Sequence, residues 1–118
     1  MSACWLAQFA DTPCDGRPVK AHLIPRQLLA REFPDGFTVE DELGEYTVPL
    51  DALIENPSTW VWACGGPMGN GGHHGMLDSR SGHANVLRVP RAMLPRRVEW
   101  FAADVGLDWW LDREYGPR

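Results

Sequence analysis

The sequence contains no long apolar run. No stretch approaches the roughly 18 consecutive apolar residues of a membrane-spanning helix, and residues 1–5 lack the basic region and apolar core of a secretion signal. We therefore expect no membrane contact and a cytoplasmic location, in a bacterium or a phage-infected host cell. Cysteine is scarce, and three cysteines in a reducing compartment exclude a disulfide framework. With four histidines in the same chain, metal binding is the use to test.

A nucleotide-binding loop is also missing. Residues 65–72 hold five glycines and one proline in eight positions, a composition that forms no regular element. They lack the Lys-Ser/Thr pair of a P-loop and the strand, turn and helix of a dinucleotide fingerprint. A nucleotide is therefore not the expected ligand of this segment.

What is present fits one small folded unit. The 118 residues suffice for a single domain at about 150 residues per domain, and a 44% apolar content with six tryptophans supplies a core. We expect the tryptophans to serve packing alone. Trp60 and Trp62 should share one face of a strand, with Trp5, Trp100, Trp109 and Trp110 packed around it.

Charges of the two signs are segregated along the chain. Residues 17–31 contain four basic residues and no acid, and residues 80–97 contain five basic residues and no acid. Residues 32–78 carry nine acidic residues and no Lys or Arg. The net charge of −5 disfavours nucleic acid on average, but the two basic segments suit phosphate contacts. We interpret the acidic block as a solvated face, with a partner surface as the alternative.

The first half of the chain predicts strands joined by short helices. Residues 19–24 have strand composition, ending near His22 or Ile24, and Pro25 then suits the first turn of a helix over residues 26–33. The turn at residues 34–36 stops that helix. Residues 37–57 show no sustained period and predict a loop-rich insertion with a helical turn at 50–54. Residues 59–63 are β-branched and aromatic and predict a second strand that ends at Cys64.

The second half is expected to be mainly helical, which makes the fold class α+β. A short helix over residues 73–78 would bring His74 and Asp78 onto one face, because residues four apart are neighbours on a helix. Residues 86–89 predict a strand closed by a proline. Apolar side chains recur at helical spacing over residues 94–105, with Gly106 just past the end. Asp108 can cap a last helix over residues 108–115.

Two strings of residues carry the chemistry. The first is Ala21-His22-Leu23-Ile24-Pro25, and the second is Cys64 followed after eight residues by His73-His74. Together they resemble the HNH endonuclease family, whose ββα-metal core has a base histidine at the end of its first strand and a metal-binding histidine on the helix after its second strand. The resemblance covers residues 4–78 and is to small stand-alone members of phages and mobile elements. It implies one nuclease domain over residues 1–118, with residues 84–115 as an accessory strand and helices.

The resemblance assigns roles that suit phosphodiester hydrolysis, which needs a deprotonated water and a cation near the leaving oxygen. His22 would be the general base. His74 would bind one catalytic divalent cation, Mg²⁺ or Mn²⁺, with Ni²⁺ or Zn²⁺ as alternatives. Asp78 would complete the cation site or bond the His74 imidazole. Without the resemblance, His22 is interpreted as a buried strand histidine and the His73-His74 pair as part of a surface loop.

Two positions depart from the family pattern. Ala21 stands where an Asp or His often binds the metal, so a further ligand must come from Asp78, His83, His73 or water. Thr59 lies near the position of the family's middle asparagine, which orients the base, and Asn56 is the alternative. We assign Thr59 to this role by its position.

The cysteines suit a structural zinc. By the resemblance, His73 replaces the second cysteine of a Cys-x-x-Cys-His string, and the ligand set is Cys4, Cys14, Cys64 and His73. Tetrahedral zinc with such ligands can fold a small domain that lacks enough core. Buried thiols without a metal are the alternative.

The expected function is metal-dependent endonuclease activity on double-stranded DNA. Basic side chains should hold phosphates rather than read bases, and the candidates are Arg17, Lys20, Arg26, Arg80, Arg88, Arg91 and Arg97. A noncatalytic zinc-stabilised module that binds DNA or protein is the alternative. A third hypothesis is an interaction protein that uses the acidic segment, for instance in a phage packaging or defence complex. The sequence leaves the cut site and the oligomeric state open.

Overall fold

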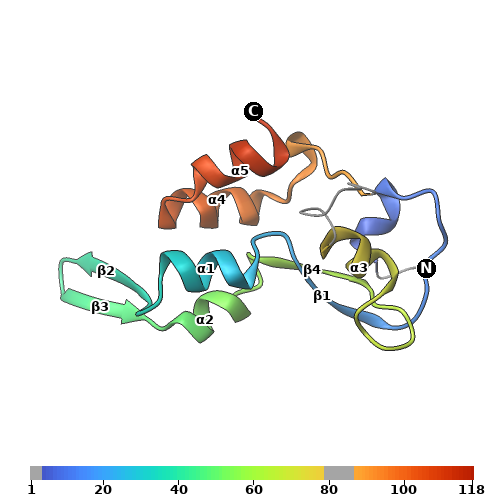
Figure 1. Ribbon diagram of the computed structural model, residues 1–118. Helices are drawn as coiled ribbons and strands as arrows, with labels where there is room; N and C mark the ends of the chain where they lie inside the picture. Colours follow the sequence, from blue (N-terminus) through green and yellow to red (C-terminus); the bar gives the residue numbers. More distant parts are fainter. Residues whose placement is uncertain (1–3, 79–86) are drawn as a thin grey trace.

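The computed structural model describes residues 4–78 and 87–118 and is an α+β protein (Figure 1). The described strands form two separate two-stranded antiparallel sheets. In chain order the elements are the 3₁₀ helix η1 (Trp5–Phe9), β1 (Pro18–His22), α1 (Arg26–Glu32), β2 (Phe37–Asp41), β3 (Gly44–Val48), α2 (Leu50–Glu55), β4 (Trp60–Cys64), α3 (Gly72–Asp78), the 3₁₀ helix η3 (Arg91–Met93), α4 (Arg96–Val105) and α5 (Asp108–Tyr115).

The sheet β1–β4 pairs two strands that lie 37 residues apart in the sequence. Pro18 stands opposite Cys64, and His22 stands opposite Trp60. β4 is rich in the β-branched and aromatic residues that suit a pleated surface, whereas β1 contributes Val19 alone of this kind, and the prediction of both strands is confirmed. The short helix α3, also predicted, packs against both strands. The strands β1 and β4 and the helix α3 therefore form one packed unit, in that order along the chain.

Proline sets the start of three helices. Pro25, Pro49 and Pro95 immediately precede α1, α2 and α4, where the missing N–H of proline costs no helical hydrogen bond. The predicted helix at 26–33 and the predicted helical turn at 50–54 are confirmed as α1 and α2. These two helices pack against each other and bury Leu28, Leu29 and Leu53.

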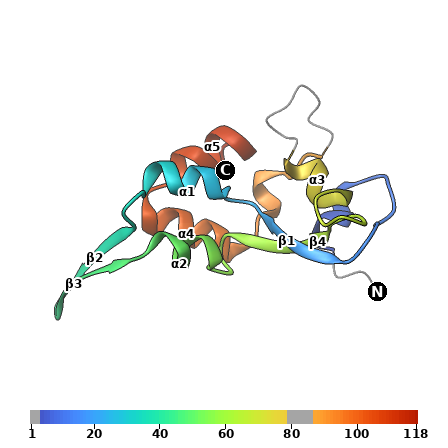
Figure 2. The same cartoon turned by 60° about the horizontal axis from the view of Figure 1, so that its bottom comes forward.

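The hairpin of β2 and β3 was not predicted. Its cross-strand pairs run from Phe37 opposite Val48 to Asp41 opposite Gly44. Figures 1 and 2 show it extending beyond the helices at one end of the molecule, which measures 49 × 29 × 27 Å along its principal axes. Apolar and polar residues alternate over only four residues in each strand, and neither face of the hairpin is fully covered, so the short pattern was interpreted as a loop.

The C-terminal part departs from expectation at two places. Residues 87–90 form no strand, although a strand was predicted at 86–89, and Val86 lies outside the described residues. Leu87 and Val89 are buried on either side of the exposed Arg88, so their alternation comes from packing without a strand partner. Asp108 is the first residue of α5 rather than its cap, which is Leu107.

The helix α4 is confirmed and ends at Gly106, whose φ of 76° lies in the left-handed region that favours glycine. It packs against α5, and the two helices lie above α1 in Figure 1. None of the described helices, of which α4 with ten residues is the longest, has the length and apolar character needed to cross a bilayer.

The prediction that tryptophans pack around the strand of Trp60 and Trp62 is wrong for Trp100 and Trp109. Trp110 is buried, but Trp62, Trp100 and Trp109 expose 47%, 64% and 45% of their surface. On α4 the core face is formed by Val98, Phe101, Ala102 and Val105, which leaves the Trp100 side chain on the solvent side. Trp60 and Trp62 do share one face of β4, with ring centroids 5.0 Å apart.

Candidate functional site

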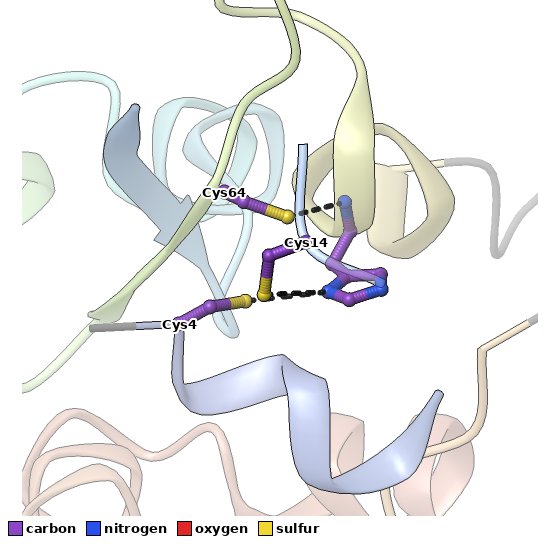
Figure 3. A group of neighbouring side chains, drawn as sticks. Cys4, Cys14 and Cys64 are labelled. Atoms are coloured by element: carbon purple, nitrogen blue, oxygen red, sulfur yellow. Dashed lines mark hydrogen bonds between the residues drawn. The ribbon is translucent and has the colours of Figure 1, made fainter. Parts of the chain in front are cut away.

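Three cysteines and one histidine meet beside the β1–β4 sheet. The Sγ atoms of Cys4, Cys14 and Cys64 and a ring nitrogen of His73 all lie within 4.8 Å of one another. Figure 3 shows the three sulfur atoms directed toward one another from separate segments of the chain. Tetrahedral zinc, with bonds of about 2.3 Å to sulfur and 2.0–2.1 Å to nitrogen, places its ligand atoms roughly 3.5–3.8 Å apart. The predicted Cys₃His set is therefore assembled as a cluster that can hold a metal such as zinc.

The His73 ring has the orientation that a zinc ligand needs. Its Nδ1 atom lies 3.4 Å from the Cys4 Sγ and 3.8 Å from the Cys14 Sγ (Figure 3). On the other side of the ring, Nε2 lies 3.0 Å from the carbonyl oxygen of Thr12, which can only accept a hydrogen bond. The Nε2–H group donates this bond, so the neutral ring carries its lone pair on Nδ1, facing the sulfurs. Metal-binding histidines commonly have such a backbone partner.

Two glycines allow the chain to close around the cluster. Gly72 has a φ of 58°, and a Cβ there would lie 2.7 Å from the Cys64 carbonyl oxygen. Gly16 has a φ of 79°, and a Cβ there would lie 2.2 Å from the Gly66 carbonyl oxygen. The close approach at Gly72 lets the backbone N–H of His73 donate to the Cys64 Sγ at 3.2 Å. The glycine-rich segment therefore shapes the cysteine cluster.

The buried thiols differ in acidity. Burial raises the pKa of the Cys4 thiol above its ordinary value. Burial acts on the Cys64 thiol in the same direction, but hydrogen bonds from the backbones of His73 and Asp15 and from the thiols of Cys4 and Cys14 together lower the pKa of Cys64. A thiolate accepts such N–H bonds strongly and is the form that binds a metal.

His22 ends β1 and is held by a backbone carbonyl. Its side chain is 7% exposed, and its Nε2 atom lies 2.8 Å from the carbonyl oxygen of Ile54 in α2. Because a carbonyl only accepts, Nε2 carries the proton, and the neutral ring has its lone pair on Nδ1. The geometry fixes one tautomer of His22.

Thr59 binds the same carbonyl as His22. The fully buried Thr59 hydroxyl lies 3.1 Å from the Ile54 oxygen and 2.8 Å from the Asn56 oxygen. The Thr59 carbonyl in turn accepts the N–H groups of Leu23 and Ile24, just after His22. Thr59 therefore contacts the support of His22, whereas the Asn56 side chain accepts the backbone N–H of Ser58.

His74 and His22 line one open groove. Its volume is about 1190 Å³, and His74 reaches it from α3 as a half-buried side chain. The Asp78 side chain and all of His83 lie outside the described part of the structure. Ala21 is fully buried and offers no ligand atom. Within residues 4–77 and 87–118, the Cys₃His cluster is the one group of three or more metal-ligating side chains close enough to share an ion.

Basic side chains surround the same groove. The lining includes Arg17, Lys20, Arg26 and Arg31, and one acidic residue, Glu114. Arg17 and Arg26 were predicted to contact phosphate, and both are exposed. Lys20 is paired with Glu55 at 2.6 Å, and this hydrogen bond lowers the pKa of Glu55. Because both partners are exposed, the pair is weak and open to exchange with a phosphate.

The second basic segment is dispersed by the fold. Arg91, predicted to bind phosphate, is 7% exposed and donates to Glu99 at 2.7 Å and to Asp112 at 2.6 Å, so it holds the C-terminal helices together. Arg97 donates to the carbonyls of Pro57 and Trp60, which fixes α4 to β4. Arg88 is exposed beside a smaller pocket of about 400 Å³. Arg80 lies outside the described residues.

Several contributors to the site have no signature in the sequence. The Thr12 and Ile54 carbonyls position His73 and His22, and a backbone carbonyl exists at every residue. Trp110 and Glu114 reach the groove from α5, far from the motifs in sequence. An amphipathic pattern could have placed Trp110 on an inner face, but nothing local predicts which groove it meets.

Comparison of the chain with models of protein families, with curated proteins and with solved structures finds no match.

Proposed function

We propose that this chain is an HNH-type, metal-dependent endonuclease that hydrolyses phosphodiester bonds of DNA. The observation that carries the proposal is one groove lined by His22, His74 and four basic side chains. Basic side chains bind the phosphate backbone, and an imidazole is the side chain best suited to take a proton from water near neutral pH. The strand, strand and helix order beside the groove agrees with the resemblance to the HNH family.

In this proposal His22 is the general base. The bond from Nε2–H to the Ile54 carbonyl holds the ring in the tautomer that accepts a proton at Nδ1. Thr59 is a positioning residue, because its hydroxyl fixes the carbonyl and not the substrate. The arrangement supplies orientation of the base without a carboxylate.

A divalent cation bound near His74 would compensate the charge that develops on the leaving oxygen. His74 is the proposed protein ligand, with Asp78 or His83 as its partner, and Mg²⁺ or Mn²⁺ is the proposed ion, with Ni²⁺ or Zn²⁺ as alternatives. We propose a separate structural Zn²⁺ at Cys4, Cys14, Cys64 and His73. Because His73 and His74 are adjacent on α3, that zinc would hold His74 in position at the groove.

The substrate and setting follow from the same proposal. DNA would be held by Arg17, Arg26 and Arg31, after Lys20 exchanges Glu55 for a phosphate. We propose a cytoplasmic enzyme of a bacterium or of a phage-infected cell, with a phage packaging or defence protein as a candidate partner.

The noncatalytic alternative has one observation in its favour. Ala21 supplies no ligand, and the described residues assemble one metal-ligand cluster, whose chemistry is structural. A zinc-stabilised module that binds DNA in the same groove without cutting it would use Arg17, Arg26 and Arg31 in the same way.

Plasmid nicking separates the two functions. Zinc-loaded protein is mixed with supercoiled plasmid and Mg²⁺, Mn²⁺ or Ni²⁺, beside His22→Ala and His74→Ala. We expect cation-dependent nicking by the wild type and a loss of at least about 100-fold in His22→Ala, because general base catalysis contributes about 10²–10⁴-fold. His74→Ala should need a far higher cation concentration for nicking, because it lacks the proposed ligand.

The matched control is Gln27→Ala, which removes an exposed neutral side chain from the same groove. It should nick at the wild-type rate. Folded, zinc-loaded wild type that binds the plasmid but never nicks it would contradict the enzyme and favour the binding module.

A further inference from the structure

One tryptophan on the central sheet is exposed on the outer face of its strand. Trp62 leaves 47% of its surface in solvent, while its neighbours Val61 and Ala63 point to the opposite face and are buried. Its neighbour across the sheet is Lys20, and directly opposite residues of an antiparallel pair share one face. Lys20 also lines the groove that contains His22 and His74. Trp62 does not itself line the groove, so the exposed indole lies at its border, beside Lys20.

The Trp62 indole packs on a neighbour that is itself held in place. Trp60 donates its Nε1–H to the Glu55 carbonyl at 3.1 Å, and the Lys20 Nζ atom lies 4.9 Å from the centre of its ring. The Trp62 ring packs edge-on to Trp60 at an interplanar angle of 74°. A T-shaped contact uses an edge of one ring and leaves ring faces for another partner. A rigid aromatic side chain loses little conformational entropy when a ligand stacks on it.

The charge beside Trp62 selects the kind of partner. Lys20 and Arg17 lie on the adjoining strand segment, and Arg26 and Arg31 continue the basic lining along α1. A flat aromatic surface at the border of a basic groove matches a chain that carries both π-faces and phosphates. Proteins that bind single strands use this combination of stacking side chains and a cationic track.

We propose that Trp62 is a stacking platform for an unpaired nucleobase, so that the groove takes single-stranded or locally unpaired DNA. This inference rests on the proposed function, because it requires DNA in the groove. In an intact duplex both faces of each internal base are covered by neighbouring bases, whereas a single strand, a bulge or an open end offers a free face. Trp60 and Lys20 position the indole and are not themselves the platform.

The test is a comparison of three DNA ligands of equal length. A dye-labelled single strand, a duplex and an abasic single strand are titrated with the full zinc-loaded chain, and binding is followed by fluorescence anisotropy. The wild type should bind the single strand most tightly. Trp62→Ala should weaken that binding about tenfold, since stacking contributes about 1–3 kcal/mol per base. Abasic DNA should bind wild type and variant alike, because it has no base to stack.

Two controls keep the result specific. Trp62→Phe retains a ring and should restore most of the affinity, whereas Trp62→Leu retains apolar bulk and should not. Trp109→Ala removes a comparably exposed tryptophan, 45% exposed on α5, and should leave all three affinities unchanged.

The outcomes separate this proposal from the function it rests on. If wild type binds all three ligands equally and Trp62→Ala changes none of them, the stacking platform is overturned while DNA binding stands. If Arg26→Glu weakens binding to all three, the groove is the DNA site in either case. If the folded wild type binds no DNA at all, both the platform and the proposed function are overturned.

Discussion

At the scale of single residues, the Ile54 carbonyl joins two side chains that lie far apart in sequence. It accepts the Nε2–H of His22 and lies 3.1 Å from the hydroxyl of Thr59, which shares its single proton between this oxygen and the Asn56 carbonyl at 2.8 Å. His22 and Thr59 are both buried, so neither bond can be replaced by bulk water. The position of the His22 ring therefore depends on a residue that does not reach the groove.

We expect Thr59→Val to lower the free energy of unfolding by about 1–3 kcal/mol, because the valine leaves a buried hydrogen bond unmade. Thr59→Ser keeps the hydroxyl and should lose less. Urea unfolding measures the difference. The pH profile of nicking should also change in Thr59→Val, and an unchanged profile would argue against the positioning role.

Gly72→Ala tests the backbone of the metal cluster. An added Cβ would meet the Cys64 carbonyl oxygen at 2.7 Å in a left-handed conformation, so the cluster must shift. We expect loss of bound zinc in this variant, measured by metal analysis. Gly69→Ala is the control, because Gly69 has a φ of 82° but open space around its Cβ position. Full zinc content in both variants would count against this geometry.

At the scale of elements, a buried ion network connects η3, α4 and α5. Arg91 contacts Glu99 on α4 and Asp112 on α5, and Arg118 contacts Glu99 from the C-terminal end. The hydrogen bond from Arg91 lowers the pKa of Glu99 below its ordinary value. The ionised form of Glu99 is therefore the form that the folded state prefers.

A Glu99→Gln variant should lose roughly 3 kcal/mol of stability at neutral pH, because Arg91 stays buried with part of its pairing gone. The pKa of Glu99 is lower in the folded state than in the unfolded state. Ionised Glu99 therefore contributes fully to the free energy of unfolding above its unfolded-state pKa, and this contribution disappears as the pH falls through its folded-state pKa. The stability gap between wild type and variant should close in acid. Asp104→Asn, on the exposed side of α4, should show no such gap.

The hairpin β2–β3 should be dispensable for the rest of the fold. Among the described elements each strand packs chiefly on the other, and Glu40 stands directly opposite Glu45, a like-charge pair. Replacing residues 38–47 by Asn-Gly keeps Phe37 and Val48, which border the core, and supplies a two-residue turn. We expect the free energy of unfolding to change by less than about 1 kcal/mol, and a loss of cooperative unfolding would contradict this.

At the scale of the whole molecule, the cysteine cluster ties separate parts of the chain together. Cys4 precedes η1, Cys14 precedes β1, Cys64 ends β4 and His73 lies in α3. A metal bound there would hold both strands of the central sheet and the helix beside them. Such binding is worth on the order of 10 kcal/mol in small zinc domains, comparable to the about 5–15 kcal/mol that stabilises a typical protein.

Removal of zinc by a chelator should therefore unfold much of the molecule, and added zinc should restore it, as followed by circular dichroism. His73→Ala should resemble the chelated protein. His74→Ala, changed at the next residue of the same helix, should keep its zinc and its fold while losing nicking. Identical behaviour of the two variants would contradict separate structural and catalytic sites.

Elements whose signals are local could be predicted from the amino-acid order. Prolines before α1, α2 and α4, Gly106 after α4, the Pro25 that follows β1, and the β-branched and aromatic residues of β4 act within a few residues. The four cluster residues could be named as well, but His73 was reached through the resemblance to the HNH family, and the structure shows that the four ligand atoms meet. The hairpin β2–β3 was missed, because its apolar alternation covers only four residues in each strand and most of its side chains are exposed.

Which side chains share a site depends on the tertiary fold. Arg17, Arg26, Arg91 and Arg97 all lie in basic segments of the sequence. In the fold, Arg91 and Arg97 are paired internally, whereas Arg17 and Arg26 line the groove. The fold also decided that Trp62 stays exposed while Trp110 is buried. Burial and pairing depend on contacts with segments distant in the chain, so local residue patterns do not predict either of them.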